Sequence, residues 1–534
     1  MKLVLENIEL VPGLPEERIE EAIRAGFSPS CGFTWRILRK SLDARDKKNI
    51  IYRCRVLVEL PDKAGRALLG RDGVTLFEEE QRPGGPQRIG GELSVIVVGS
   101  GPAGLFCALR LVEAGARVTI VERGRKIDER TRDLDSLRLS GTIDPESNVL
   151  FGEGGAGAYS DGKLVTRIHR PEVAEFFNYL AELGAPHEIQ YEHRPHLGTD
   201  RLVPLIRALR ARIEKSGGVY LFNERVTGII SREGRALGVH TASGRDLLSD
   251  AVVLATGHSA RDVYEILARS GIALEKKGFA VGALVEHPAE LISFIQYGKA
   301  ALKKILPAAD YRVSFKNPAS GRGVYSFCMC PGGQVINSSS EEGMLCVNGM
   351  SYSNRSGAYS NAAIVVSVRE SDIPGGPLEG IAFQRRIESQ AFLAGGGGYH
   401  APAQRITSFL DGRVDEALPP VSYEPGVRPA DVRSYLPAWV VEEIARALKS
   451  FDRSMKGFIC DQGTVIGAET RSSSPVRIPR GEDFQSLSLK GLFPAGEGAG
   501  YAGGIVSSAV DGMRTADAVC ALNRKSRGAF NVHD

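Results

Sequence analysis

The chain has 534 residues, which is too many for one compact hydrophobic core, so we expect two or three domains. Hydrophobic residues make up 43% of it and charged residues 25%, a mixture that excludes disordered and fibrous proteins. The 67 basic side chains nearly balance the 64 acidic ones, so the overall charge gives no reason to expect a nucleic-acid or membrane partner.

The first residues and the cysteines indicate a cytoplasmic protein. The N-terminal stretch lacks the basic-then-apolar layout of a signal peptide, and no run of about 18 apolar residues occurs that could span a membrane. The eight cysteines form no metal-type CxxC pair, which favours reduced thiols, and the nine histidines have no HxxxH or HxH spacing. We therefore expect a cytoplasmic location, no membrane partner and no metal site.

Residues 1–90 have the pattern of a small N-terminal α+β domain. A strand is predicted at residues 2–11, an acidic helix near residues 15–25 and a second strand at residues 49–60. Residues 82–91 are rich in glycine and proline and are predicted to form a linker into the next domain.

From Leu93 onward the chain alternates strand, glycine turn, helix and strand, the pattern of a doubly wound α/β sheet. This domain is predicted to be discontinuous, formed by residues 91–270 and 465–534. Residues 271–464 contain alternating strand patterns, for example at 279–286 and 324–330, and are predicted to be an inserted, β-rich α+β substrate domain.

A dinucleotide-binding fingerprint opens the doubly wound domain. The apolar strand 95–98 runs into Gly99-Ser100-Gly101-Pro102-Ala103-Gly104 and then into a helix over residues 105–114. Gly99 permits the tight turn, Gly101 lets a pyrophosphate approach the backbone, and Gly104 lets the helix pack on the strand. The next strand ends at Glu122, where a carboxylate can accept hydrogen bonds from both hydroxyls of a ribose. A lone GxGxxG is a weak signal, but its context here predicts dinucleotide binding.

The C-terminal stretch favours FAD over NAD. A strand near residues 492–494 leads to the glycine-flanked Glu497, then to Gly503, Gly504 and a helix from Ile505 to about Cys520. In FAD folds of the glutathione-reductase type such an acid holds the ribitol, and the helix N-terminus points at the pyrimidine end of the flavin. Two further GxGxxG matches begin at Gly152 and Gly498. We do not expect a second nucleotide site at either, because the first is followed by no helical pattern and the second by one helix without a further strand and ribose acid. We expect non-covalent FAD, with NAD(P)H open only as a transient reductant.

In these and further segments the chain resembles the FAD-dependent dehydrogenase-like proteins of bacteria and plastids, a family without an agreed substrate. The resemblance covers nearly the whole chain and rests on residues 41–45, 152–164, 324–333, 348–351, 396–404, 469–477 and 496–511. It implies an FAD site, with contacts from Gly99, Ser100, Gly101, Pro102, Ala103, Gly104, Glu122, Arg123, Gly154, Gly155, Ala156, Ser160, Asp161, Lys163, Leu164, Val226, Ala255, Thr256, Gly257, Gly496, Glu497, Gly503, Gly504 and Ile505.

Four residues are candidates for catalysis, each with a structural alternative. Arg471 could clamp a substrate carboxylate or support a reduced flavin, and an ion pair at a domain seam explains it equally well. Cys328 and Cys330 share one face of a predicted strand and could be a redox pair, but buried, unreactive thiols are favoured. His258 could be an acid or base, and a structural role is favoured for it as for His287.

Residues 36–55 hold eight basic side chains against Asp43 and Asp46, a net charge of 8 − 2 = +6. A solvated surface is favoured for this cluster, and an RNA or acidic partner is the alternative. The sequence thus predicts an FAD-dependent oxidoreductase whose substrate lies between the FAD domain and the inserted domain. The alternatives are an FAD-dependent RNA-modifying or RNA-associated protein tethered by its N-terminal domain, and a flavin-bearing scaffold without turnover. The substrate and the oligomeric state are not predicted.

Overall fold

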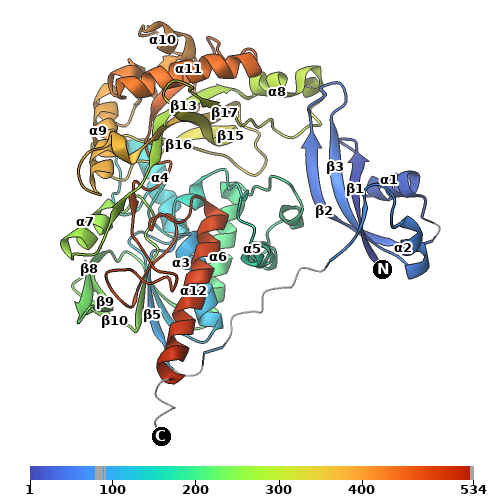
Figure 1. Cartoon of the computed structure of the whole chain (residues 1–534). Helices are drawn as coiled ribbons and strands as arrows, with labels where there is room; N and C mark the ends of the chain where they lie inside the picture. The colour runs from blue at the N-terminus through green and yellow to red at the C-terminus, as the bar shows by residue number, and fades with distance from the viewer. Residues whose placement is uncertain (30, 79–87, 90–91, 529–534) are drawn as a thin grey trace.

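The computed structural model describes residues 1–29, 31–78, 88–89 and 92–528. A small N-terminal domain lies beside a larger part that is built around two sheets (Figure 1). Apart from residues 88–89, the predicted linker at residues 82–91 lies outside the described residues. Within the described residues, no helix has both the length and the apolar composition needed to cross a membrane.

The N-terminal domain is a four-stranded antiparallel sheet in the order β2-β3-β1-β4, with two helices. Its elements are β1 (Lys2–Leu10), α1 (Arg18–Phe27), β2 (Thr34–Asp43), β3 (Ile51–Glu59), α2 (Asp62–Leu68) and β4 (Val74–Leu76). The chain order β-α-β-β-α-β together with this strand order is the ferredoxin-like arrangement. Alternate apolar residues of β1 and β3, such as Leu3 and Val56, pack with Ile19 and Ile23 of α1 in one core.

The predicted strands near residues 2–11 and 49–60 and the acidic helix between them are confirmed by β1, β3 and α1. The strand β2 was not predicted. Its exposed positions carry basic side chains such as Arg36 and Arg39, and Ile37 is its one buried residue, so its apolar alternation is weak.

The first sheet of the larger part is five-stranded, parallel throughout and in the order β22-β11-β5-β6-β7. Its strands are β5 (Ser94–Val98), β6 (Arg117–Val121), β7 (Val219–Leu221), β11 (Ala251–Leu254) and β22 (Leu492–Pro494). Because β22 follows β11 by more than 200 residues of chain yet pairs with it, this α/β sheet combines two separate stretches. The predicted strands at 95–98 and near 492 are confirmed.

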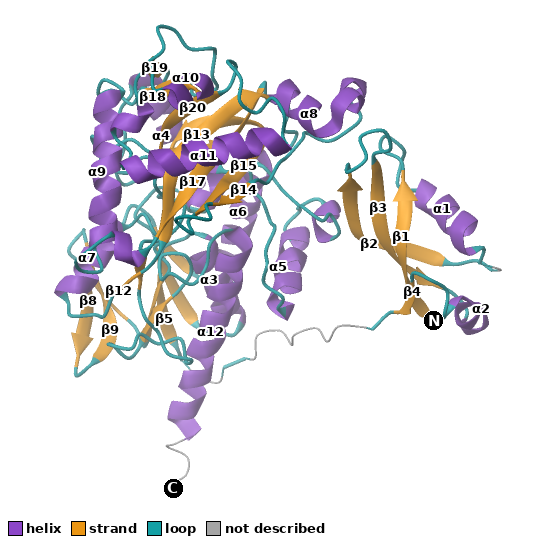
Figure 2. Ribbon diagram, turned by 45° about the horizontal axis from the view of Figure 1, so that its top comes forward, coloured by secondary structure: helices purple, strands orange, loops and turns teal. Residues whose placement is uncertain are grey.

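Both faces of this sheet are covered, which explains why its strands are continuously apolar. Val95 and Val97 face one core with α3, α5, α6 and α12, and Ile96 and Val98 face a second core with β8, β9 and α7 (Figure 2). The covering elements are α3 (Pro102–Glu113), α4 (Ile127–Ser140), η1 (Ala156–Tyr159), α5 (Pro171–Glu182), η2 (His187–Gln190), α6 (Thr199–Lys215), β8 (Val226–Arg232), β9 (Arg235–Thr241), β10 (Asp246–Leu248), α7 (Arg261–Arg269) and α12 (Ile505–Gly528).

The second sheet lies above the first in Figure 1 and is mostly antiparallel, in the order β14-β15-β17-β13-β20-β18-β19, with β16 paired to β15. Its strands are β13 (Phe279–Pro288), β14 (Ser314–Lys316), β15 (Gly323–Asn337), β16 (Val347–Met350), β17 (Tyr359–Val368), β18 (Ala401–Arg405), β19 (Val427–Pro429) and β20 (Thr464–Glu469). Its helices are α8 (Ala289–Tyr297), η3 (Gly298–Lys303), η4 (Glu370–Asp372), α9 (Glu379–Ala394), α10 (Ile406–Asp411), η5 (Val432–Ser434) and α11 (Ala438–Ser454). The small pair β12 (Glu275–Lys276) and β21 (Val476–Arg477) lies at its junction with the first sheet.

The strands predicted at residues 279–286 and 324–330 are confirmed by β13 and β15. The boundary expected at residue 465 is different in the structure. Residues Val465 and Ile466 of β20 pair with both β13 and β18, so the chain leaves the second sheet only after Glu469.

Candidate functional site

A large cavity lies where the carboxyl ends of the parallel strands face the second sheet. Its volume is about 350 Å³, within the roughly 300–1,000 Å³ common for small-molecule pockets. Its lining comes from the ends of β5, β6 and β11, from the loop between α4 and α5, from the start of α12, and from β15 and β16. Open α/β sheets bind ligands at this end of their strands.

The glycine turn after β5 has three glycines with different roles. Gly99 has a φ of +98°, and a Cβ there would lie 2.4 Å from the carbonyl oxygen of Ala255. A Cβ on Gly104 would lie 1.9 Å from the carbonyl oxygen of Gly99. A Cβ on Gly101 would instead meet only the Cα of Gly155, at 3.8 Å. The space beside Gly101 therefore belongs to the cavity, at the start of α3, which has no side-chain cap.

Glu122 joins three loops around this turn. Its Oε2 accepts hydrogen bonds from the backbone N and the Oγ of Ser100, at 2.8 and 2.7 Å. Its Oε1 accepts from the backbone N of Gly124 and of Gly152, at 2.9 and 3.0 Å. These four donors occupy the roughly four acceptor positions of a carboxylate. The structure therefore gives Glu122 a positioning role, and the ribose contact expected from the sequence would have to share an acceptor position that is already in use.

The loop after η1 brings Asp161 and Lys163 to the cavity wall. Asp161 accepts hydrogen bonds from Ser351 and from the guanidinium of Arg355. The ammonium of Lys163 lies 3.6 Å from Asp161 and is buried without a hydrogen-bond partner. An ammonium group has three donors, and burying it without an acceptor is costly. This orphaned donor in the cavity wall indicates a site built around a ligand with electron-rich oxygen or nitrogen atoms.

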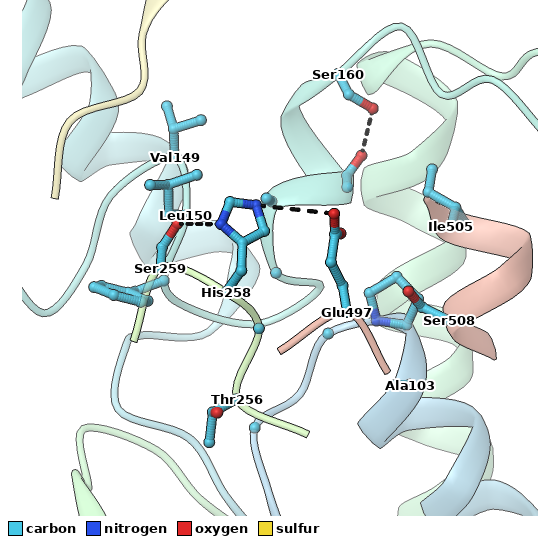
Figure 3. A pocket seen from close by; sticks show the side chains of 18 of the residues that line it. Ala103, Val149, Leu150, Ser160, Thr256, His258, Ser259, Glu497, Ile505 and Ser508 are labelled. Atoms are coloured by element: carbon cyan, nitrogen blue, oxygen red, sulfur yellow. Dashed lines mark hydrogen bonds and ion pairs between the residues drawn. The ribbon is translucent and has the colours of Figure 1, made fainter. Parts of the chain in front are cut away.

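The side chains of His258 and Glu497 point toward each other in the cavity (Figure 3), with Nε2 of His258 and Oε1 of Glu497 4.0 Å apart. Burial, together with the charges of Arg471 and Arg261, lowers the pKa of His258 to about 3, so its imidazole is neutral near pH 7. Burial raises the pKa of Glu497 to about 7, although Lys277 acts in the opposite direction. A neutral imidazole with so low a pKa is a poor proton acceptor, which favours the structural alternative for His258.

Arg471 lies in the cavity wall, but its guanidinium is bound by protein groups. Its Nε and Nη2 donate to the two oxygens of Glu388 at 3.2 and 2.9 Å, and its Nη1 donates to Ser340 at 2.6 Å. Glu388 also accepts two hydrogen bonds from Arg261, at 3.0 and 2.7 Å. All three ionic side chains are at most 5% exposed. Of the two roles expected for Arg471, the structure supports the ion pair at a domain seam.

Cys328 and Cys330 do not follow the regular alternation of a strand. The register of β15 against β17 shifts between Phe327 and Cys330, and Cys328 has a φ of +46°. Both cysteines are free and line the cavity, but Cys328 is exposed there whereas Cys330 is buried. The expectation that both are buried is therefore wrong for Cys328, because the bulge turns this residue toward the cavity. Burial by the cavity walls still raises the pKa of the Cys328 thiol to about 12, so it is uncharged.

The cavity brings together 20 of the 24 residues that the family resemblance implies for FAD, as well as all four catalytic candidates. Gly104, Gly154, Leu164 and Gly496 lie just behind the wall. They pack against Gly99, Ile206, the core beside α3 and Ala103 respectively. The sequence reasoning missed lining residues at the second sheet, above all Phe327 and Asn348. Both lie in motifs that carry the resemblance, but only the fold turns them toward the cofactor loops.

Two other features bear on the expected partners. In the basic cluster at residues 36–55, Lys40 pairs with Glu16, Arg55 with Glu6, and Arg53 with Glu9 as well as Asp43. These glutamates lie outside the window that was counted, so part of the +6 charge is neutralised within the domain. In the described part of the chain, no three or more His, Cys, Asp or Glu side chains gather in a group that could hold a metal ion.

Two family models match the chain. Residues 278–472 match the C-terminal domain-like family of FAD-dependent proteins, and residues 94–131 match an FAD binding domain. An uncharacterised protein of Clostridium beijerinckii is 42% identical over 490 residues, which cover 90% of this chain and 91% of that protein. The thiamine thiazole synthase of Aeropyrum pernix is 29% identical over 198 residues, 34% of this chain and 62% of that enzyme.

Among solved structures, the FAD-complexed glycerol-3-phosphate dehydrogenase of Bacillus halodurans is similar over 81% of this chain and 66% of its own, with 13% identity and a TM-score of 0.35. A similarity this low supports no conclusion about function.

Proposed function

The chain belongs to the family of FAD-dependent proteins that share this C-terminal domain, and on that premise we propose that it is an oxidoreductase acting on a small molecule held between the parallel sheet and the second sheet. FAD is its cofactor. The observation that carries the proposal is one cavity that combines the glycine turn at Gly101, the acid Glu497 and a wall supplied by β15 and β16.

The residues of the cavity fit FAD at several points. The open space beside Gly101 at the start of α3 would take the pyrophosphate, and Glu497 would accept hydrogen bonds from the ribitol. The ammonium of Lys163, which pairs with Asp161 at 3.6 Å but makes no hydrogen bond, would donate to the flavin ring or to a group beside it. Gly503, Gly504 and Ile505 bring the N-terminus of α12 to the cavity, where its dipole favours negative charge. When bound, FAD supplies hydride or electron transfer.

The wall from the second sheet would hold the substrate and exclude water. Phe327 provides an apolar surface there, and Asn348 provides an amide whose Oδ1 already accepts from the backbone N of Gly349 at 2.7 Å. Cys328 contributes a neutral thiol, and Arg471 holds the seam between the two sheets together with Glu388. We assign no catalytic role to His258.

The RNA-associated alternative has no specific observation in its favour. The basic cluster of the N-terminal domain is partly paired with Glu6, Glu9 and Glu16. An electrophoretic mobility shift that depends on Arg36 and Arg39 would revive this alternative.

Redox competence can be measured before the substrate is known. The purified protein is expected to be yellow, to release its FAD on denaturation and to be reduced by light under anaerobic conditions. Candidate acceptors and donors are then ranked by the rate at which they reoxidise or reduce the flavin. A protein that takes up FAD but exchanges electrons with none of a broad panel would support the flavin-bearing scaffold instead.

Glu497 is predicted to contribute to FAD affinity in a pH-dependent way. At pH 8, where its carboxyl is mostly ionised, Glu497→Ala should weaken FAD binding about 10- to 150-fold, because a charge-assisted hydrogen bond contributes roughly 1.5 to 3 kcal/mol. Glu497→Gln should lose less, since an amide oxygen still accepts a hydrogen bond. At pH 6 the carboxyl is mostly protonated, because its pKa is about 7. The difference in FAD affinity between Glu497→Gln and the parent should therefore be smaller at pH 6 than at pH 8.

Titrating FAD into the three apoproteins at both pH values checks this prediction. Equal dissociation constants for all three would show that Glu497 does not bind the cofactor. If the ratio of the FAD dissociation constants of Glu497→Gln and the parent were the same at pH 6 and pH 8, the carboxyl of Glu497 would not be the group that titrates in this range.

A further inference from the structure

A short segment, residues 191–198, contacts the N-terminal domain at one end and the cofactor cavity at the other. At the domain end of this segment, the backbone N of Lys40 donates to the carbonyl of Tyr191 at 2.8 Å, and the backbone N of His193 donates to the carbonyl of Lys40 at 2.9 Å. Lys40 and Glu192 form a parallel bridge. The segment thus pairs through this single bridge with the outer edge of β2, the strand of this sheet that lies nearest the rest of the molecule in both views (Figures 1 and 2).

Side chains strengthen this contact. Glu16, in the loop before α1, accepts a hydrogen bond from Lys40 Nζ at 2.6 Å and another from the hydroxyl of Tyr191 at 3.0 Å. The side chain of Tyr191 packs against the core of the N-terminal domain. Arg39 also contacts the ring of His193, at 2.7 Å from Nδ1. Tyr191 therefore belongs structurally to the N-terminal domain although it lies in the chain between α5 and α6.

The other end of the segment holds the loop of the cofactor cavity. The backbone N of Leu164 donates to the carbonyl of Pro195 at 2.9 Å, and the backbone N of Leu197 donates to the carbonyl of Gly162 at 3.1 Å. The backbone N of Gly198 donates to the carbonyl of Asp161, also at 3.1 Å. Ser160, Asp161, Gly162 and Lys163 all line the cavity. Residues 195–198 thus form the backbone partner of this loop.

Arg194 is the single residue between His193, which binds the N-terminal domain, and Pro195, which binds the cofactor loop. Proline fixes its own φ and restricts the preceding residue to extended conformations. The two contacts are therefore joined by a stiff connection. The approach at the loop is also close, because a Cβ on Gly162 would lie 2.8 Å from the backbone N of Gly198.

A second contact keeps the N-terminal domain in place. Lys47, in the hairpin between β2 and β3, donates to the carbonyl of Ile295 in α8 at 2.7 Å. Leu42, Ala44 and Ile50 pack against the core of the second sheet. The domain is thus attached to the second sheet at one point and to the cofactor loop, through residues 191–198, at another.

We propose that the N-terminal domain is a positioning element of the FAD site, which holds residues 160–164 in their cofactor-binding arrangement by pairing β2 with residues 191–193. This role goes beyond the oxidoreductase proposal, because it concerns retention of FAD whatever the substrate is. Tyr191, Lys40 and Glu16 are the positioning residues. They act through the backbone of residues 193–198 and do not themselves line the cavity.

Tyr191→Ala in the full-length chain tests the proposal, because it removes both the ring from the N-terminal core and the hydrogen bond to Glu16. FAD should bind the apoprotein roughly tenfold more weakly, a change of about 1.4 kcal/mol. Hydrogen exchange should become faster in peptides covering residues 160–166 and 191–199. The matched control is Phe33→Ala, which removes an aromatic ring from the same core, where Phe33 also stacks with Arg24 of α1. It should leave FAD affinity and exchange in both peptides unchanged.

Faster exchange at residues 191–193 with an unchanged FAD dissociation constant would overturn the proposal, because the contact would then be lost without consequence for the cofactor. If these amides stay protected in Tyr191→Ala, the second variant is Lys40→Pro, which removes the backbone donor to the Tyr191 carbonyl itself. Weaker FAD binding in Lys40→Pro would support the proposal, and an unchanged FAD dissociation constant would overturn it. Since FAD binding is measured without turnover, a failure here is distinct from a failure of the oxidoreductase proposal.

Discussion

Glu388→Ala is expected to lower the free energy of unfolding by about 3 to 5 kcal/mol, the cost of leaving a buried ion pair without one partner. The carboxylate of Glu388 is fully buried and accepts hydrogen bonds from both Arg261 and Arg471. Its removal leaves two guanidinium groups in the protein interior with less compensation. Chemical denaturation of the parent and the variant, monitored by circular dichroism, measures the difference.

Glu341→Ala is the matched control, because Glu341 binds Arg261 and Arg385 in the same network but is 26% exposed in its side chain. Glu341→Ala should lower the free energy of unfolding by about 1 kcal/mol or less, as for partly solvated ion pairs. Similar losses for the two variants would show that burial is not what makes Glu388 important.

The effect of Glu388 should also depend on pH. Burial alone would raise its pKa, but the charges and hydrogen bonds of Arg261 and Arg471 hold the pKa below its ordinary value. A carboxyl with a lowered folded-state pKa stabilises the protein above its unfolded pKa, about 4.3, and this contribution is lost as the pH falls through the folded value. The stability difference between parent and Glu388→Ala should therefore be constant from pH 6 to 8 and shrink in acid.

Gly101→Val is expected to abolish FAD retention while the protein still folds. A Cβ at position 101 would meet no protein atom closer than 3.8 Å, and the residue has an ordinary φ of −74°. The added methyl groups would instead occupy the space in which the pyrophosphate approaches the backbone. We expect FAD affinity to fall by at least about 1,000-fold, or 4 kcal/mol, with Gly101→Ala intermediate.

Gly104→Ala provides the contrast, because its Cβ would lie 1.9 Å from the carbonyl oxygen of Gly99, within the protein itself. In this variant the stability of the fold should fall more than the affinity for FAD. FAD bound per chain after gel filtration, together with the thermal melting of each apoprotein, separates the two effects. Full FAD occupancy in a folded Gly101→Val protein would refute the placement of the phosphates.

Much of the fold follows from local patterns. The GxGxxG turn is recognisable because glycine is required at Gly99 and Gly104 by contacts within a few residues or one strand away. The strand β5 is recognisable because burial on both faces requires continuous apolar residues, whereas β13 and the first half of β15 are recognisable by their alternating strand patterns. The strand β2 was missed because its stability comes from pairing with β3 and with residues 191–193, and its own side chains are mostly polar.

The sequence by itself determined that the chain contains a dinucleotide-binding turn and a C-terminal acid and helix suited to FAD, because these signals depend on neighbouring residues. Only the tertiary structure decided that Arg471 is neutralised by Glu388, that a bulge turns Cys328 toward the cavity, and that Glu122 is saturated by Ser100, Gly124 and Gly152. Each of these outcomes depends at least in part on residues that are distant in the chain. The charge, orientation and free hydrogen-bonding capacity of a side chain are set by the neighbours that folding brings to it, and no local spacing specifies them.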